Sequence, residues 1–231
     1  MSKNYKFIFF DLDRTLWDFE TNSLLTFKEI YKNRELYNIF PDFNSFIKTY
    51  KIINEDLWEK YRKGEITKLE LRTNRFLLTL NKFNVNDIEL AKNIGNDYIN
   101  ESPKKKEVFP HTYEILDYLY PKYNLIILTN GFKEVQTSKL KNCQLNKYFS
   151  KLICSEDTGY QKPNPKIFQY ALSSLNAKKA ESIMVGDDLN VDIIGANNFK
   201  IDTIYCNFIN NEKSNIPTYE ITSLKEILNI L

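Results

Sequence analysis

The order of apolar and polar stretches along the chain predicts an α/β fold. Short apolar runs, each long enough for one buried strand, recur between polar segments. The predicted strands are 5–10, 124–129, 151–154, 182–186 and 201–205. The predicted helices of this part are one after Pro110 that runs through Ile115 and Leu119, and those at 133–142, 164–175, 190–198 and 223–230. Because strands and helices alternate, we expect a Rossmann-like parallel sheet with helices on both faces.

Residues 18–105 interrupt this alternation with helical patterns and no convincing strand. One predicted helix ends at Gly64, a second opens with the capping-box spacing of Thr67 and Glu70, and Asn86 is predicted to cap a third. A helical insertion directly after the first strand is typical of a lid over a site. We therefore predict a core of residues 1–17 and 106–231 and an all-helical cap of residues 18–105.

Composition narrows the class of protein. The 231 residues are 42% hydrophobic and 27% charged, and the net charge of +2 gives no indication of a nucleic-acid polymer as partner. No apolar run is long enough to cross a membrane, and the N-terminus has no secretory signal pattern. Three widely spaced cysteines indicate reduced thiols. We expect a cytoplasmic enzyme, monomeric or homodimeric.

Two carboxylates follow the first predicted strand. Asp11 and Asp13 are spaced i, i+2, so in an extended chain their side chains point to the same side. Like charges held this close repel each other unless a cation or a proton lies between them. A solvated turn is the alternative for this motif taken alone. The pair otherwise predicts a metal site or an acid–base pair at the carboxyl end of the strand.

Three more polar motifs follow later strands. Thr129-Asn130-Gly131 follows the strand at 124–129, Lys162 lies in a proline-containing loop after the strand at 151–154, and an acidic motif from Asp187 to Asp192 follows the strand at 182–186. Ligands of parallel sheets bind outside the carboxyl ends of the strands, so we expect all four motifs to converge. Their side chains have the chemistry of a bound phosphate and a divalent cation.

This order of motifs resembles the haloacid dehalogenase superfamily, with its Asp-x-Asp-x-Thr sequence, a Thr or Ser, a Lys and a final acidic motif. Arg14 departs from the resemblance at a position where Gly is commonest, and its role stays open. The resemblance implies Mg²⁺ as cofactor, with Asp11, Asp187 and the Asp13 carbonyl as ligands. It also implies that Asp11 is the nucleophile, with Asp13 as general acid and base.

The remaining positions of the motifs have supporting roles under this resemblance. Lys162 should neutralise both the phosphate and the nucleophile, and Thr129, Asn130 and Gly131 should bind the phosphate beside a helix N-terminus. Thr15 should support the first loop, and Asp192 should orient Lys162 or a metal-bound water. Asp188 is ambiguous. His111, outside the motifs, is expected to be structural or solvated.

Longer stretches resemble pyrimidine 5′-nucleotidases of the house-cleaning type, namely 11–19, 128–132 and 155–163 with the linker residues Ser102-Pro103 and Phe109-Pro110. This implies hydrolysis of pyrimidine nucleoside 5′-monophosphates, a small-molecule phosphate monoester being the partner. A sugar-phosphate phosphatase and a phosphomutase remain alternatives, because both keep every motif. A 2-haloacid dehalogenase fits less well, because Asp13 has no place in its chemistry. Trp17, Phe19 and Trp58 are candidates for stacking a base, although core packing is the commoner use of such residues.

Overall fold

A computed structural model of the chain describes residues 4–209 and 214–231. Its sheet has six parallel strands in the order β3-β2-β1-β4-β5-β6. The strands are β1 Phe7–Phe10, β2 Asn124–Thr129, β3 Lys151–Cys154, β4 Ser182–Gly186, β5 Asp202–Cys206 and β6 Tyr219–Ile221. This arrangement, with helices around the sheet, confirms the predicted α/β fold class. The strand β6 was not predicted, because only three residues form it.

Both faces of the sheet are buried, which explains why its strands read as continuous apolar runs. Side chains of successive residues point to opposite faces. Ile8 and Phe10 accordingly belong to one apolar cluster, with Leu125 and Ile127 of β2, whereas Phe9 belongs to the cluster on the other face. Strands in which polar and apolar residues alternated would instead indicate that one face of the sheet is exposed to solvent.

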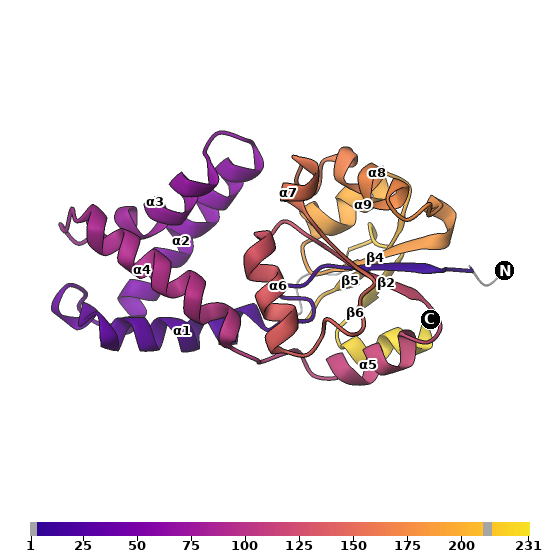
Figure 1. The fold of residues 1–231 in the computed structure, drawn as a ribbon, viewed down its shortest axis with the longest axis horizontal. Helices are drawn as coiled ribbons and strands as arrows, with labels where there is room; N and C mark the ends of the chain where they lie inside the picture. Colours follow the sequence, from indigo (N-terminus) through magenta and orange to yellow (C-terminus); the bar gives the residue numbers. More distant parts are fainter. Residues whose placement is uncertain (1–3, 210–213) are drawn as a thin grey trace. The chain divides into compact units, whose positions relative to one another are not determined.

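Helices cover both faces of the sheet (Figure 1). The apolar cluster on one face includes residues of α5 Thr112–Leu119, α6 Lys133–Asn142 and a C-terminal 3₁₀-helix, Leu224–Asn229. The cluster on the other face includes residues of α8 Pro165–Ser173 and α9 Gly195–Asn198. A short helix, α7 Ser155–Thr158, follows β3 directly.

The chain divides into two compact units, Met1–Glu20 with Lys106–Leu231, and Thr21–Lys105. The second unit is helical. Its helices are α1 Phe19–Asn33, which begins in the first unit, α2 Phe43–Arg62, α3 Lys68–Asn81 and α4 Ile88–Glu101. Its core is rich in aromatic rings around Phe27, which stacks on Tyr98 with ring centres 4.6 Å apart.

Local sequence signals set the helix ends of this unit. Thr67 and Glu70 form the predicted capping box, since each side chain accepts a hydrogen bond from the backbone N–H of the other residue. The predicted cap Asn86 is wrong by one residue, because the Asp87 carboxylate caps α4 by accepting from the Leu90 N–H at 2.9 Å. A carboxylate also gains from the positive end of the helix dipole.

Two predicted helices differ in kind from those observed. The segment predicted as one helix at 190–198 is a π-helix, Leu189–Ile194, followed by α9. The predicted C-terminal helix is the 3₁₀-helix Leu224–Asn229. Over so few residues, the spacing of apolar positions does not distinguish a 3₁₀-helix or a π-helix from an α-helix.

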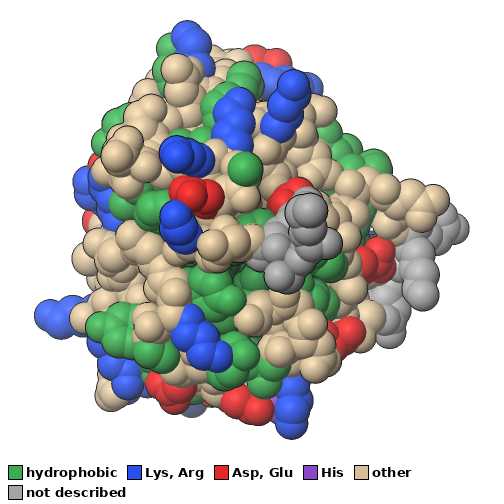
Figure 2. Space-filling view, turned by 90° about the vertical axis from the view of Figure 1, so that its right-hand side faces the viewer, with side chains coloured by type: hydrophobic (Ala, Val, Ile, Leu, Met, Phe, Trp, Pro, Cys, Tyr) green, Lys and Arg blue, Asp and Glu red, His purple; other side chains and the backbone are tan. Residues whose placement is uncertain are grey.

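The surface carries charges of both signs. Figure 2 shows one face on which Lys and Arg side chains are interspersed with Asp and Glu and with apolar side chains, in keeping with the net charge of +2. Among the described residues, no helix combines the length and apolarity that crossing a membrane requires.

Candidate active site

The topology of the sheet brings two of the sequence motifs together. The chain forms β1, β2 and β3 towards one edge and then returns to place β4 on the other side of β1. Ligands of such sheets bind at this reversal of strand order, outside the carboxyl ends of the strands. Asp11 follows β1 and Asp187 follows β4, so the reversal places both carboxylates next to each other.

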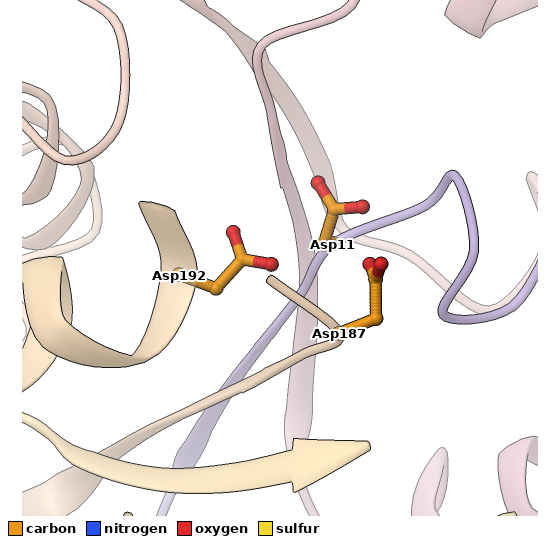
Figure 3. Close-up of side chains that lie close together, drawn as sticks. All are labelled: Asp11, Asp187 and Asp192. Carbon is orange, nitrogen blue, oxygen red and sulfur yellow. The ribbon is translucent and has the colours of Figure 1, made fainter. Parts of the chain in front are cut away.

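Three carboxylates face a common space at this point (Figure 3). Asp11, Asp187 and Asp192 each have an oxygen within 4.8 Å of the others. Burial raises the pKa of Asp11 to about 7, against an opposing effect of Lys162 and with a further rise from Asp192. The pKa of Asp187 is also raised well above its ordinary value, first by burial and then by Asp192 and Asp11. With all three carboxylates ionised, this buried cluster therefore needs a positive charge beside it.

Lys162 supplies the cation among these carboxylates. Its Nζ lies 2.6 Å from Asp11 Oδ1 and 2.7 Å from Asp192 Oδ1, and it donates to the Leu128 carbonyl at 2.7 Å. Burial would lower the pKa of Lys162, but Asp11 and Asp192 outweigh it and the pKa is raised. Lys162 therefore remains charged although its side chain is only 1% exposed.

Asn130 fixes the backbone of the Lys162 loop. Its Nδ2 donates to the Lys162 carbonyl at 2.9 Å, and its Oδ1 accepts from the Lys162 N–H at 2.8 Å. The Thr129 hydroxyl accepts from the Gly131 N–H at 3.0 Å, which closes the turn into α6. A side chain at Gly131 would meet Gln136, since a Cβ there would lie 2.3 Å from its Nε2. The predicted phosphate-binding residues thus form one loop. The side chain of Asn130 in this loop also sets the position of Lys162.

The remaining predicted residues divide into two groups. Thr15 lies at the site, and its hydroxyl donates to Asp187 Oδ1 at 3.1 Å. Asp188 points elsewhere, because its carboxylate caps the π-helix by accepting from the backbone N–H groups of Asn190 and Val191. Arg14 pairs with Glu20 at 2.8 Å. The φ angle of Arg14 is 64°, a left-handed conformation that explains the preference for glycine at this position in the resembling family.

The Asp13 carboxylate is bound by two side chains that the sequence analysis missed. Gln136 Nε2 donates to Asp13 Oδ2 at 2.9 Å, and Lys139 Nζ lies 2.5 Å from Asp13 Oδ1. Both residues are buried on α6, three positions apart and so on one helix face. The sequence shows that Gln136 and Lys139 share one face of this helix. It does not show that this face is buried, because a Gln and a Lys on a polar helix usually face solvent.

Two aromatic candidates for base stacking are used in packing. Trp17 is fully buried, the centre of its ring lies 3.9 Å from Lys139 Nζ, and it packs edge-on against Phe19.

His111 is partly exposed and pairs with Glu114 at 2.7 Å, away from the motif residues. Its expected structural or solvated role agrees with this contact.

The donor set of the acidic cluster fits a hard divalent cation. Mg²⁺ prefers oxygen ligands and keeps several waters, and Asp11 and Asp187 offer carboxylate oxygens at the required closeness. Asp192 is engaged by Lys162, and a Cβ at Gly186 would lie 2.3 Å from Asp192 Oδ2. Asp192 is therefore held by the backbone turn and by Lys162, and it is less suited than the other two to bind a metal directly.

Comparisons with known proteins identify relatives along nearly the whole chain. Pyrimidine 5′-nucleotidase YjjG of Escherichia coli (strain K12) is 31% identical over 230 residues, which cover 98% of each chain. A glyceraldehyde 3-phosphate phosphatase of Pyrococcus furiosus is 28% identical and covers 99% of this chain and 94% of its own. A crystal structure of HAD-hydrolase YfnB from Bacillus subtilis, bound to magnesium, superposes with a TM-score of 0.90 at 27% identity and covers 99% of each chain.

The family itself is shown by a match over most of the chain. Residues 8–206 match the family model of haloacid dehalogenase-like hydrolases, a range that contains every motif of the site. The expected superfamily is thereby confirmed, and the chain belongs to the haloacid dehalogenase-like hydrolase family.

Proposed function

We propose that this hydrolase is a Mg²⁺-dependent phosphomonoesterase that works through an aspartyl-phosphate. The observation that carries the proposal is the buried arrangement of Lys162 between Asp11 and Asp192, with Asp187 alongside. A cation placed against a carboxylate nucleophile favours attack on a phosphate, because it offsets the repulsion between two anions.

The reaction consists of two displacements at phosphorus. Lys162 binds Asp11 Oδ1, which leaves Oδ2 to attack. The new bond from Oδ2 to phosphorus forms as the ester bond breaks, and Asp13 gives a proton to the leaving oxygen. A water then attacks phosphorus and gives its proton to Asp13, which frees Asp11 and inorganic phosphate. During each cycle Asp13 keeps the contact of Oδ1 with Lys139 and exchanges the contact of Oδ2 with Gln136 for a contact with the substrate.

The other motif residues hold the groups that react. The loop Thr129-Asn130-Gly131 precedes α6, and backbone N–H groups at a helix start bind phosphate oxygens. Asp11, Asp187 and the Asp13 carbonyl oxygen would hold Mg²⁺, whose charge would offset negative charge on the phosphate. Thr15 keeps Asp187 in place through its hydroxyl, and Asp192 keeps Lys162 in place.

The proposed substrates are pyrimidine nucleoside 5′-monophosphates. YjjG is a pyrimidine 5′-nucleotidase and matches this chain along nearly its full length, cap included. A sugar-phosphate phosphatase is the second candidate, favoured by the similarity to the glyceraldehyde 3-phosphate phosphatase. The catalytic residues of the core bind only the phosphate and the cation, so they are compatible with either substrate class.

A substrate panel tests the proposal. Phosphate release should be measured for dUMP, dTMP, UMP, glyceraldehyde 3-phosphate and ribose 5-phosphate, with Mg²⁺ and with EDTA. We expect turnover only with Mg²⁺, and a higher kcat/KM for the pyrimidine nucleotides. Turnover unchanged in EDTA would contradict the metal assignment, and a preference for sugar phosphates would contradict the nucleotidase assignment alone.

Isotope transfer separates a phosphatase from a phosphomutase of the same fold. In water labelled with ¹⁸O, the second displacement should place one labelled oxygen in the released phosphate, because water attacks the aspartyl-phosphate. A mutase would instead pass the phosphoryl group to a hydroxyl of a second substrate. Recovery of an isomeric sugar phosphate without labelled phosphate would overturn the hydrolytic reaction.

A further inference from the structure

Arg14 has a backbone conformation that favours glycine, although it belongs to the loop that carries the catalytic carboxylates. It lies between Asp13 and Thr15, and its φ angle is 64°. A residue with a Cβ atom is less stable than glycine in this left-handed region. The ion pair with Glu20 does not offset this difference, because ion pairs between exposed side chains contribute little to stability. The fold alone therefore gives no reason for an arginine at this position.

The guanidinium of Arg14 is held on one face and along one edge. Its Cζ lies 4.4 Å from the centre of the Phe19 ring, so the ring covers one face. Its Nε and Nη2 donate to Glu20 Oε1 at 3.1 and 2.8 Å. All three residues belong to the first compact unit, which also contains Asp11 and Asp13. The side chain is thus fixed within the unit that carries the catalytic carboxylates.

A second edge of the same guanidinium is open. Its Nη1 has no hydrogen-bond acceptor among residues 4–209 and 214–231, and 51% of the side-chain surface is exposed. Nη1 and the second N–H of Nη2 form two parallel donors at the end of the side chain. Two such donors match the paired oxygens of a carboxylate or a phosphate. Because Phe19 and Glu20 already restrict the side chain, binding an anion would order it little further.

The guanidinium lies on the leaving-group side of the proposed reaction. Its neighbour Asp13 is the group that protonates the leaving oxygen. Lys139, whose Nζ binds the Asp13 carboxylate, lies 5.8 Å from the centre of the Phe19 ring that also holds Arg14. Partial burial would lower the pKa of Arg14, but carboxylates, those of Asp187 and Asp13 among them, raise it. The charge of Arg14 therefore acts on the site at the point where the leaving group departs.

We propose that Arg14 binds a second anionic group of the substrate, one that the leaving group carries. This group is a phosphate or a carboxylate, since both present paired oxygens to a guanidinium. The inference rests on the proposed phosphatase reaction, and it adds the class of leaving group that the enzyme prefers. It holds for a nucleotide as for a sugar phosphate, because a nucleoside 3′,5′-bisphosphate and a sugar bisphosphate both carry such a group.

Matched substrates isolate the second anion. Deoxyuridine 3′,5′-bisphosphate and dUMP differ in the 3′-phosphate, and ribose 1,5-bisphosphate and ribose 5-phosphate differ in the 1-phosphate. 3-Phosphoglycerate and glyceraldehyde 3-phosphate differ in a carboxylate. For loss of the shared phosphate, kcat/KM should favour the doubly anionic member of at least one pair about fivefold, the upper range for an exposed ion pair, because the contact is bidentate. The preferred pair identifies the anion as a phosphate or a carboxylate.

Two variants separate a bound anion from a structural ion pair. Arg14→Gly suits the left-handed backbone, so the Tm should not fall, and the preference should disappear. Glu20→Gln keeps an acceptor for Arg14 but removes the competing negative charge, so the preference should not fall. A loss of preference in both variants would mean that the ion pair matters and that no anion is bound. Arg34→Gln, which breaks a surface pair with Asp97, is the control and should keep the wild-type preference.

Direct binding separates the inference from the reaction beneath it. In Asp11→Asn, which should bind substrates without turnover, calorimetric titration with both members of each pair gives the ratio of their Kd values. The ratio of the preferred pair should fall to about one when Arg14→Gly is added, because the bidentate contact is lost. Equal kcat/KM and Kd within every pair, or a preference that survives Arg14→Gly, would overturn the anion site and leave the phosphatase reaction intact. A protein without phosphatase activity that binds the doubly anionic member more tightly through Arg14 would overturn the proposed function and support the site.

Discussion

Lys139 Nζ lies 2.5 Å from Asp13 Oδ1, and the lysine side chain is only 4% exposed. The same ammonium lies 3.9 Å from the centre of the Trp17 ring, so packing as well as charge holds it in place. With Gln136 on the other carboxylate oxygen, α6 fixes the direction of the Asp13 side chain. The helix that begins at the proposed phosphate-binding loop therefore also positions the proposed general acid.

Replacing Lys139 by Met should impair proton transfer to the leaving group. Met keeps most of the buried aliphatic volume but removes the charge that orients Asp13. We expect kcat for an alkyl phosphate to fall about tenfold or more, within the range that general acid–base catalysis contributes. For 4-nitrophenyl phosphate, whose leaving group needs little protonation, the loss should be smaller. The ratio of the two kcat values is the measurement.

Lys141→Met provides the matched control, because Lys141 lies on the exposed side of the same helix. It should leave the ratio at its wild-type value. Equal losses on both substrates in Lys139→Met would mean that Lys139 supports the fold of α6 without directing Asp13.

Replacing Asp11 by Asn should abolish turnover while the protein stays folded. The amide is no nucleophile, and removal of a catalytic nucleophile lowers kcat by several orders of magnitude. Because burial raises the pKa of Asp11, the ionised carboxylate destabilises the fold, and its loss should not lower the Tm above pH 7 in EDTA. Asp56→Asn, a surface change, should retain full activity. A variant of Asp11 that kept a tenth of the wild-type kcat would exclude it as the nucleophile.

Removing the cation of the cluster should reveal coupling between its members. Lys162→Met leaves Asp11 and Asp192 without their shared partner, and breaking a buried ion pair in this way costs about 3–5 kcal/mol. Adding Asp11→Asn to this variant should recover part of the loss, since one of the unpaired carboxylates disappears. Urea unfolding of the four proteins in EDTA gives the coupling, expected at about 1–3 kcal/mol. Purely additive changes would contradict the geometry of this ion pair.

The sequence predicted which side chains lie together better than it predicted their other contacts. Asp11 and Asp187 could be placed together because each follows an apolar run, and strand ends of a parallel sheet share one edge. The residues next to Lys162 in the sequence do not indicate that it is buried, since it is buried by contacts with residues distant in the chain. Its position after the third predicted strand and the order of the motifs supplied that prediction.

The missed contacts have physical reasons. Gln136 and Lys139 look like solvent-facing residues until the fold brings Asp13 to α6. Arg75 likewise reads as a surface residue of an amphipathic helix, and only the packing of α3 shows that it is buried between rings. Long-range contacts of polar side chains leave no periodic signal in a sequence, whereas burial of apolar ones does.

The affinity for Mg²⁺ should rise with pH around neutrality. The pKa of Asp11 is raised to about 7, chiefly by burial, while Lys162 opposes the rise, and the pKa of Asp187 is raised as well. In the metal-free protein the folded state thus keeps protons that the unfolded state has lost. Stability is therefore highest below the unfolded pKa of about 4 and declines as the pH rises towards 7.

The affinity for Mg²⁺ has the opposite pH dependence to the stability of the metal-free protein. Mg²⁺ binds ionised carboxylates, so it must displace the protons that the folded state retains at low pH. With one group of pKa about 7 to deprotonate, the apparent Kd should be about tenfold lower at pH 8 than at pH 6. Calorimetric titration with MgCl₂ at pH 6, 7 and 8 measures this dependence, and repeating it in buffers of different ionisation enthalpy counts the protons released. Asp56→Asn should keep the wild-type profile, since Asp56 pairs with Lys60 on the surface of α2. A Kd that stays constant over this range, with no proton released, would show that the cation binds elsewhere than at Asp11 and Asp187.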